Sequence, residues 1–167
     1  VEDLRTVLSA LREDLSQDPR TTLEELVTTA REAGTQVTVT YADGASPDVF
    51  TGLSTMAQHA VHRAVQEGLT NARKHAAGQP VSITVREAAG AVDIEMRNPV
   101  PREKAGADTG NGADVTGGYG LVGLRERVEL SGGRMSIVAN QGSPEGKEGK
   151  EFRWSIQLPL AHKEAAQ

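Results

Sequence analysis

The stretch His62–Ala76, HRAVQEGLTNARKHA, is the most informative part of this 167-residue chain. It has the pattern of a helix in which Glu67, Asn71 and Lys74 stand among small and apolar residues. These three side chains are spaced at i, i+4 and i+7, so they lie on one face of the helix. A carboxylate, an amide oxygen and an ammonium in one row suit a metal-bridged polyphosphate. Ordinary surface helices also alternate charges, so the rest of the chain has to decide between these interpretations.

Length and composition limit the number of domains and the classes of protein that fit this chain. The chain has room for one domain with a real core. A net charge of −5, with no basic run longer than a pair, argues against a nucleic-acid surface. The absence of cysteine excludes disulfides and thiolate chemistry and fits a reducing compartment. No apolar run approaches the roughly 20 residues of a membrane span and no signal-peptide pattern is present, so we expect no membrane contact by this chain.

Hydrophobic periodicity predicts the order of helices and strands. Apolar residues at helical spacing predict helices over 4–15, 22–33, 53–76 and 121–130, and alternating apolar residues predict strands over 36–41, 81–85, 92–98, 135–139 and 152–160. Each strand has one apolar and one polar face, as in a sheet that helices cover on one side only. We therefore predict an α/β (α+β) two-layer sandwich with a mixed, mostly antiparallel sheet, and not a doubly wound parallel sheet.

Two segments rich in glycine and charge interrupt this pattern. Residues 99–117 contain almost no apolar side chains, and we expect them to form a mobile loop. Residues 140–150, NQGSPEGKEGK, form a second expected loop. The tail at 161–167 is expected to fray.

The segment Gly118–Gly123, GYGLVG, matches the pattern G-x-G-x-x-G of dinucleotide-binding folds. That interpretation needs a strand directly before the motif, and here a glycine-rich loop precedes it. We therefore reject the dinucleotide-binding interpretation. Two local properties of the segment still suit a phosphate group: glycines permit close backbone approach, and a helix start presents free N–H groups to an anion. Arg125 and Arg127 add positive charge nearby. The alternative is a flexible hinge before an amphipathic helix.

Asn98 ends the strand VDIEMRN and, by strand parity, points to the same side as Val92 and Met96. A buried amide needs hydrogen-bond partners. Its oxygen can accept from an exocyclic amine while its NH2 donates to a ring nitrogen, a pattern that suits adenine. The alternative is an asparagine that only ends the strand before Pro99.

Histidine-based metal binding and the common nucleophile motifs have little support. His59 and His62 are spaced i, i+3 beside Glu67, and no third ligand follows at a diagnostic spacing. His75 lies at the helix end, where a partly charged imidazole suits the helix dipole, so a capping role competes with a functional one. Neither a Gly-x-Ser-x-Gly motif nor a Walker A element is present.

Together these motifs resemble a known family. VQEGLTNARKHA resembles the N-box of sensor histidine kinases, and GGYGLVGLRERVELSGG resembles their G2 box. The phrase LRERV before a Gly-Gly turn is similar to the subfamily that pairs with NarL/LuxR-type response regulators. Upstream, LRTVLSALRED and LEELVTTAREAG resemble that subfamily's segment between the dimerisation helices and the ATP-binding domain. The resemblance covers about residues 1–160.

The resemblance implies a Bergerat-type (GHKL, HATPase_c) α/β sandwich that binds ATP and Mg2+. It divides the chain into a remnant of the dimerisation helix and linker at 1–17, an ATP-binding catalytic domain at 18–160 with a lid at about 99–117, and a flexible tail at 161–167. The implied activity is transfer of the ATP γ-phosphoryl group to a histidine.

By the same resemblance, Asn71 coordinates the Mg2+ that bridges the phosphates. Glu67 is the implied catalytic residue, which orients a metal-bound water or polarises the acceptor histidine. Lys74 and His75 contact phosphate oxygens, and Asn98 binds adenine. The remaining nucleotide-binding residues lie where the lid meets the next helix: Gly118, Gly120, Leu121 and Gly123.

One motif departs from the family pattern. The family's G1 box reads Asp-x-Gly-x-Gly, whereas Asn98–Pro101, NPVP, stands in its place. The charge-assisted bond to the adenine amine becomes a neutral one, which weakens nucleotide affinity. The missing glycines also change the expected geometry of the adenine-side loop.

The acceptor histidine of the family lies on an upstream dimerisation helix, and no histidine precedes His59. The chain also begins with Val1, so we expect a fragment that binds ATP without phosphorylating itself. The implied partners are the phosphoacceptor domain of the same protein, in a homodimer, and a NarL/LuxR-type response regulator. The implied location is the cytoplasm, with a membrane-anchored parent protein. The alternatives are a degenerate docking module without kinase activity, or another GHKL-type ATPase or serine kinase.

Overall fold

The computed structural model describes residues 23–99, 119–140 and 151–161. These residues form, in chain order, α2 (Leu23–Glu32), β1 (Val37–Ala42), the 3-10 helix η1 (Pro47–Gly52), α3 (Thr55–His75), β2 (Val81–Ala88), β3 (Ala91–Pro99), α4 (Tyr119–Leu130), β4 (Arg134–Asn140) and β5 (Glu151–Pro159). The helix expected over 4–15 and the tail from residue 162 lie outside the described residues, and so do nearly all of the two expected loops.

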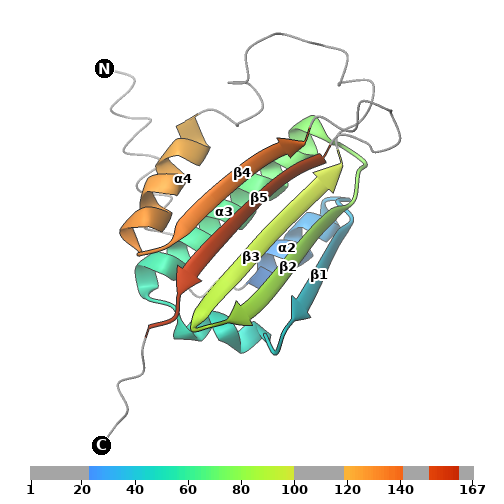
Figure 1. Cartoon of the computed structure of the whole chain (residues 1–167). Helices are drawn as coiled ribbons and strands as arrows, with labels where there is room; N and C mark the ends of the chain where they lie inside the picture. Colours follow the sequence, from blue (N-terminus) through green and yellow to red (C-terminus); the bar gives the residue numbers. More distant parts are fainter. Residues whose placement is uncertain (1–22, 100–118, 141–150, 162–167) are drawn as a thin grey trace, which may run out of the picture.

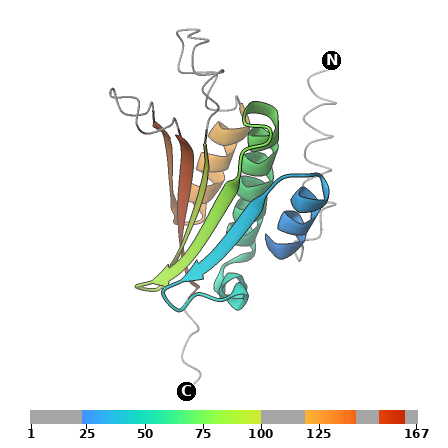
Figure 2. The same cartoon turned by 90° about the vertical axis from the view of Figure 1, so that its right-hand side faces the viewer.

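The strands form one five-stranded sheet in the order β1-β2-β3-β5-β4. β1 pairs with β2 in parallel, and the other neighbours pair antiparallel. The helices α2, α3 and α4 all lie on one face of this sheet, with α3 in the middle (Figures 1 and 2). The predicted two-layer sandwich with a mixed, mostly antiparallel sheet is therefore confirmed.

The core lies between α3 and the inward face of the central strands. Strand register aligns Ile94 of β3 with Val85 of β2 and with Ile156 of β5, and all three are fully buried. One residue pair further along, Met96 lies opposite Trp154. Inward residues alternate with exposed ones along β3 and β5, which is the pattern expected for a sheet covered on one side.

The region before α3 differs from the sequence-based expectation. The structure has the short helix η1 there, and α3 begins at Thr55, after Ser54 rather than at Leu53. The Ser54 hydroxyl accepts a hydrogen bond from the Ala57 N–H at 3.2 Å and so caps the helix. A 3-10 helix of six residues, about two turns, is too short for its periodicity to show in sequence, so turn chemistry was all that could be predicted.

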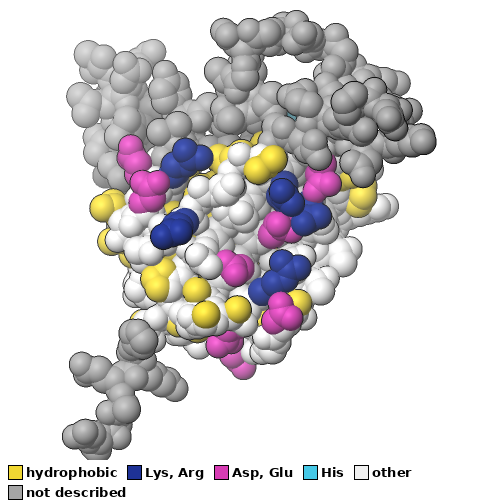
Figure 3. Space-filling model, viewed as in Figure 1, with side chains coloured by type: hydrophobic (Ala, Val, Ile, Leu, Met, Phe, Trp, Pro, Cys, Tyr) yellow, Lys and Arg dark blue, Asp and Glu magenta, His cyan; other side chains and the backbone are white. Residues whose placement is uncertain are grey.

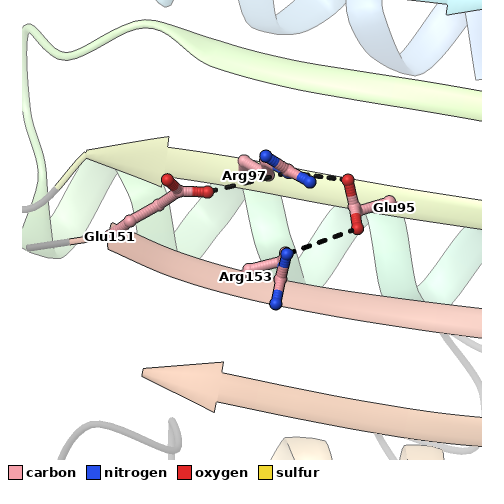
Figure 4. Close-up of polar contacts among 4 residues, drawn as sticks. All are labelled: Glu95, Arg97, Glu151 and Arg153. Atoms are coloured by element: carbon pink, nitrogen blue, oxygen red, sulfur yellow. Dashed lines mark hydrogen bonds and ion pairs between the residues drawn. The ribbon is translucent and has the colours of Figure 1, made fainter. Parts of the chain in front are cut away.

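The outer face of the sheet is polar, and basic and acidic side chains are interspersed over it (Figure 3). Arg97 and Arg153 lie directly opposite each other on β3 and β5, which alone would be repulsive. Glu95 offsets this: its carboxylate is 2.6 Å from Arg97 Nε and 3.9 Å from Arg153, while Glu151 lies 3.7 Å from Arg97 (Figure 4). The hydrogen bond to Glu95 raises the pKa of Arg97 above its usual value. This face is thus solvated, and its ion pairs add little stability.

Two glycines at the end of α4 fix how the chain enters β4. Gly132 has a φ of +79°, and its N–H donates to the Glu129 carbonyl at 2.9 Å, while the Gly133 N–H donates to the Val128 carbonyl at 2.9 Å. This is a Schellman cap, and it confirms the predicted stop. A Cβ on Gly133 would collide with the Gln157 carbonyl of β5, so this turn also needs glycine for packing.

Gly68, in the middle of α3, brings the helix close to the sheet. A Cβ built on Gly68 would lie 2.5 Å from Met96 Sδ and 2.7 Å from Trp154 Nε1. Both neighbours are 1% exposed, so neither can move away into solvent. The absence of a side chain here sets the distance between α3 and the central strands.

We predict that Gly68→Ala lowers the free energy of unfolding by about 1–3 kcal/mol, because the methyl group overpacks the interface. Urea denaturation measures this. Gly123→Ala on α4 is the matched control, since a Cβ there meets nothing within 4 Å. That variant should gain about 0.5–1 kcal/mol from its helix propensity. Equal gains in both variants would show that the contact at Gly68 is not tight.

Candidate functional site

Three segments that are distant in sequence meet at one end of the sandwich. The C-terminal half of α3, the C-terminal end of β3 and the start of α4 lie at the same end in both views (Figures 1 and 2). Each carries one of the motifs singled out from the sequence. The expected lid at 99–117 and Gly118 lie outside the described residues, apart from Pro99.

Asn98 lies on the helix-facing side of β3, as strand parity predicted. Among the residues that the structure describes, it alone is polar and buried, with 5% of its surface exposed. It lies opposite Phe152 of β5. The described residues offer its amide one long hydrogen bond, 3.5 Å from Nδ2 to the carbonyl oxygen of the adjacent Pro99. A bond of this length is at the limit of the geometric criteria, so most of the amide's capacity is left for another partner.

The row on α3 occupies the same level of the sandwich as Asn98. Gly68 lies over Met96, and α3 and β3 run in the same direction (Figure 1). Three residues along a helix advance by about 4.5 Å and two along a strand by about 6.7 Å, so Asn71 and Asn98 come to a similar height. Glu67 and Asn71 are half-buried, whereas Lys74 and His75 in the last turn are exposed.

Helical spacing also separates the two flanks of α3. Glu67 and Asn71 lie on one flank, and Gln58, His62 and Val65 lie on the opposite flank. The second flank faces α2, because those residues line a cavity together with residues of α2. The Glu67–Asn71 row therefore faces the side on which α4 lies (Figure 1).

The cavity on the α2 flank has a volume of about 630 Å³ and is separate from the site at Asn98. The residues that line it come from α2, β1, η1 and α3: Leu23, Glu24, Leu26, Tyr41, Pro47, Asp48, Phe50, Thr51, Thr55, Gln58, Val61, His62 and Val65. The Tyr41 hydroxyl is buried and finds no hydrogen-bond partner in the described part of the chain. Burial, and then the nearby Glu24 carboxylate, raise the pKa of Tyr41. Sequence analysis missed this cavity because no single motif encodes walls from four elements.

The start of α4 completes the site. This helix begins at Tyr119, two residues before the expected start at Leu121, so Gly120 and Leu121 both lie in its first turn. Helix starts leave backbone N–H groups without partners inside the helix, and these suit an anion. Gly123 is exposed, and the space around it is open. Arg125 is also exposed, one turn further along.

These residues fit a nucleotide with a bound Mg2+ better than a protein-held metal. Among the described residues, no three of the types His, Cys, Asp and Glu gather as they would around a metal ion. Asn71 offers a neutral hard oxygen, which Mg2+ accepts when phosphates supply most of its other ligands. Asn98 offers an underused buried amide to a base. The exposed Lys74 and His75 lie at the solvent end, where phosphates would be.

Comparison with known proteins defines the class. The family model described as "Histidine kinase-, DNA gyrase B-, and HSP90-like ATPase" matches residues 56–162. This chain therefore belongs to that family. The match includes α3, β3 and α4, which are the three elements that build the site.

Individual relatives are more distant. The signal transduction histidine-protein kinase/phosphatase DegS of Brevibacillus brevis is 34% identical over 82 residues, which are 47% of this chain and 19% of DegS. The chain thus spans about a fifth of the length of that relative. Two nucleotide-free structures of the catalytic domain of histidine kinase ThkA share the fold. Each match covers 84% of this chain and 93% of the ThkA chain. The TM-scores are 0.52 and 0.50, and the sequence identities are 16% and 14%.

The chain is therefore a domain of the histidine kinase-, DNA gyrase B- and HSP90-like ATPases, and ATP is the nucleotide that this family implies. Among the described residues, no helix is both long and apolar enough to cross a membrane.

We predict that Asn98→Leu folds with an unfolding free energy equal to the parent's or up to about 1 kcal/mol higher, because the buried amide has only one long hydrogen bond to lose. Met96→Asn, two residues earlier on the same face, should cost about 3 kcal/mol or more. Thermal or urea unfolding of both variants checks this. A loss of more than 1 kcal/mol in Asn98→Leu would mean that Asn98 holds the fold together.

Proposed function

We propose that this domain binds MgATP and transfers its γ-phosphoryl group to a histidine on an upstream dimerisation helix, for relay to a response regulator. The observation that carries this proposal is the meeting of the Glu67–Asn71 row, Asn98 and the start of α4 at one end of the sheet. Base, metal and phosphate groups of one nucleotide would each find a suitable partner there.

In this proposal the nucleotide lies along the end of the sandwich. Asn98 binds the adenine edge at the buried end, and Lys74 and His75 contact phosphate oxygens at the exposed end. Asn71, between them, would hold the Mg2+ through its side-chain oxygen. When bound, the Mg2+ neutralises charge on the phosphates. Backbone N–H groups at the start of α4, around Gly120 and Leu121, contact the phosphates from the other side, with Gly118 and Gly123 permitting close approach.

Glu67 is the proposed catalytic residue, one helical turn before Asn71. Its half-buried carboxylate accepts the N–H proton of the incoming imidazole, so that the other ring nitrogen keeps its lone pair for attack on phosphorus. The acceptor loses a proton and gains a phosphoryl group, and ADP leaves. Positioning and charge neutralisation supply the rest of the acceleration.

The domain limits, partners and location belong to the same proposal. The ATP-binding domain spans residues 18–160, with a lid at about 99–117. The acceptor domain belongs to the same protein in a homodimer, and the regulator is of the NarL/LuxR type, which the LRERV segment supports. The cytoplasm is the proposed location.

A second candidate is a docking module that has lost nucleotide turnover. The observation that favours it is Asn98–Pro99 at the end of β3, where a neutral amide replaces a carboxylate. Titration with MgATP separates the two candidates. Absence of binding at millimolar MgATP would support the docking module and overturn the kinase proposal.

We predict that Asn71→Asp weakens MgATP binding at least tenfold, about 1.4 kcal/mol, because a new negative charge lies beside the triphosphate. Isothermal titration calorimetry measures the change. Gln58→Glu, the same chemical change on the opposite flank of α3, should stay within about twofold of the parent. Binding of near-parental strength by Asn71→Asp would remove Asn71 from the metal site.

We also predict that Glu67→Gln keeps MgATP affinity within about twofold but slows phosphoryl transfer by about 10²–10⁴, because the amide cannot accept the imidazole proton. The assay follows labelled phosphate from ATP to a dimerisation domain that bears the acceptor histidine, supplied as a separate protein. Glu87→Gln, which changes an exposed side chain of β2, is the control. Equal loss of binding and transfer would make Glu67 a binding residue.

A further inference from the structure

The carboxamide of Asn98 offers both a donor and an acceptor from one planar group. Its Oδ1 accepts hydrogen bonds and its Nδ2 donates them, and a half-turn about the last side-chain bond exchanges their positions. A carboxylate at the same place would offer acceptors only. The chemistry of the base edge that this position can bind is therefore wider than for an acidic residue.

We propose that the site accepts 6-oxopurine nucleoside triphosphates as well as 6-aminopurine ones, with Asn98 turning its amide to suit either. This rests on the proposed function, since it concerns the same site. With adenine, Oδ1 accepts from the 6-amino group and Nδ2 donates to N1. With hypoxanthine, Nδ2 donates to O6 and Oδ1 accepts from N1–H. Both bases thus receive two neutral hydrogen bonds.

The structure leaves the amide without a strong local partner that would fix one orientation. Its hydrogen bond to the Pro99 carbonyl is 3.5 Å long. The side chains that lie nearest in the register are apolar: Phe152 is paired with Asn98, and Met96 precedes it on the same face. Turning the amide therefore breaks only this long, weak hydrogen bond.

The buried side-chain atoms that have no hydrogen-bond partner among the described residues lie elsewhere. Tyr41 is in the cavity on the α2 flank. Gln66 projects away from the sheet side of α3, because it is two residues before Gly68 on the helix. Trp154 Nε1 lies beneath Gly68, against the helix backbone. These three atoms are therefore not placed to contact the base, and we assign the recognition of the base edge to Asn98.

Titration of the whole 167-residue chain with MgATP and MgITP tests this proposal. ITP is the sharpest probe because hypoxanthine and adenine differ at position 6 and N1 and carry no 2-amino group. We expect the two dissociation constants to lie within about tenfold of each other. Asn98→Asp should shift the ratio toward ATP by tenfold or more, because a carboxylate facing O6 places two acceptors opposite each other.

Each other outcome has a definite meaning. Tight MgATP binding with MgITP more than about tenfold weaker would overturn this proposal and leave the proposed function intact. Binding of neither nucleotide would overturn both. Magnesium tripolyphosphate, which carries no base, is the control: affinity equal to that for MgATP would show that the triphosphate alone is bound and would overturn the proposal. If Asn98→Asp does not fold, as circular dichroism would show, the parental ATP-to-ITP ratio still decides.

Discussion

The close approach of α3 to the sheet at Gly68 is the constraint on which the rest of the site depends. Without a Cβ, Gly68 can lie over Met96 and Trp154, and this contact fixes both the depth and the register of the helix against β3. A shift of one residue would rotate the Glu67–Asn71 row by about 100° and carry Asn71 away from Asn98. The geometry of the proposed nucleotide site is therefore set by the packing of one glycine, which itself contacts no ligand.

The one-sided sheet explains why the site lies at an end of the sandwich. The outer face carries the Glu95–Arg97–Arg153 ion pairs, whose side chains are partly exposed to solvent. The inner face is filled by α3. Where β3 leaves the sheet and α4 begins, a helix start offers free backbone N–H groups, and side chains from three segments can converge. The cavity beside Tyr41 lies on the opposite flank of α3, away from this convergence.

Much of the fold could be predicted from periodicity because the sheet is covered on one side. The alternation along β3 placed Asn98 inward, and its 5% exposure confirms that placement. Periodicity could not find η1, which is too short, or the early start of α4 at Tyr119, where glycines carry no pattern. The cavity by Tyr41 depends on tertiary packing, which no local motif records. The roles of Glu67, Asn71 and Asn98 stay predictions, because they depend on contacts with a nucleotide.

The neutral amide at Asn98 changes how binding energy would be divided along the nucleotide. A carboxylate buried among Met96 and Phe152 would carry a desolvation cost and have a raised pKa, so its charge would depend on pH. The neutral amide avoids the cost of burying a charge, but it gives up a charge-assisted bond to the base. The phosphate end must then contribute more, through Lys74, His75 and the start of α4. Binding should consequently depend strongly on Mg2+ and on salt, and only weakly on the identity of the purine.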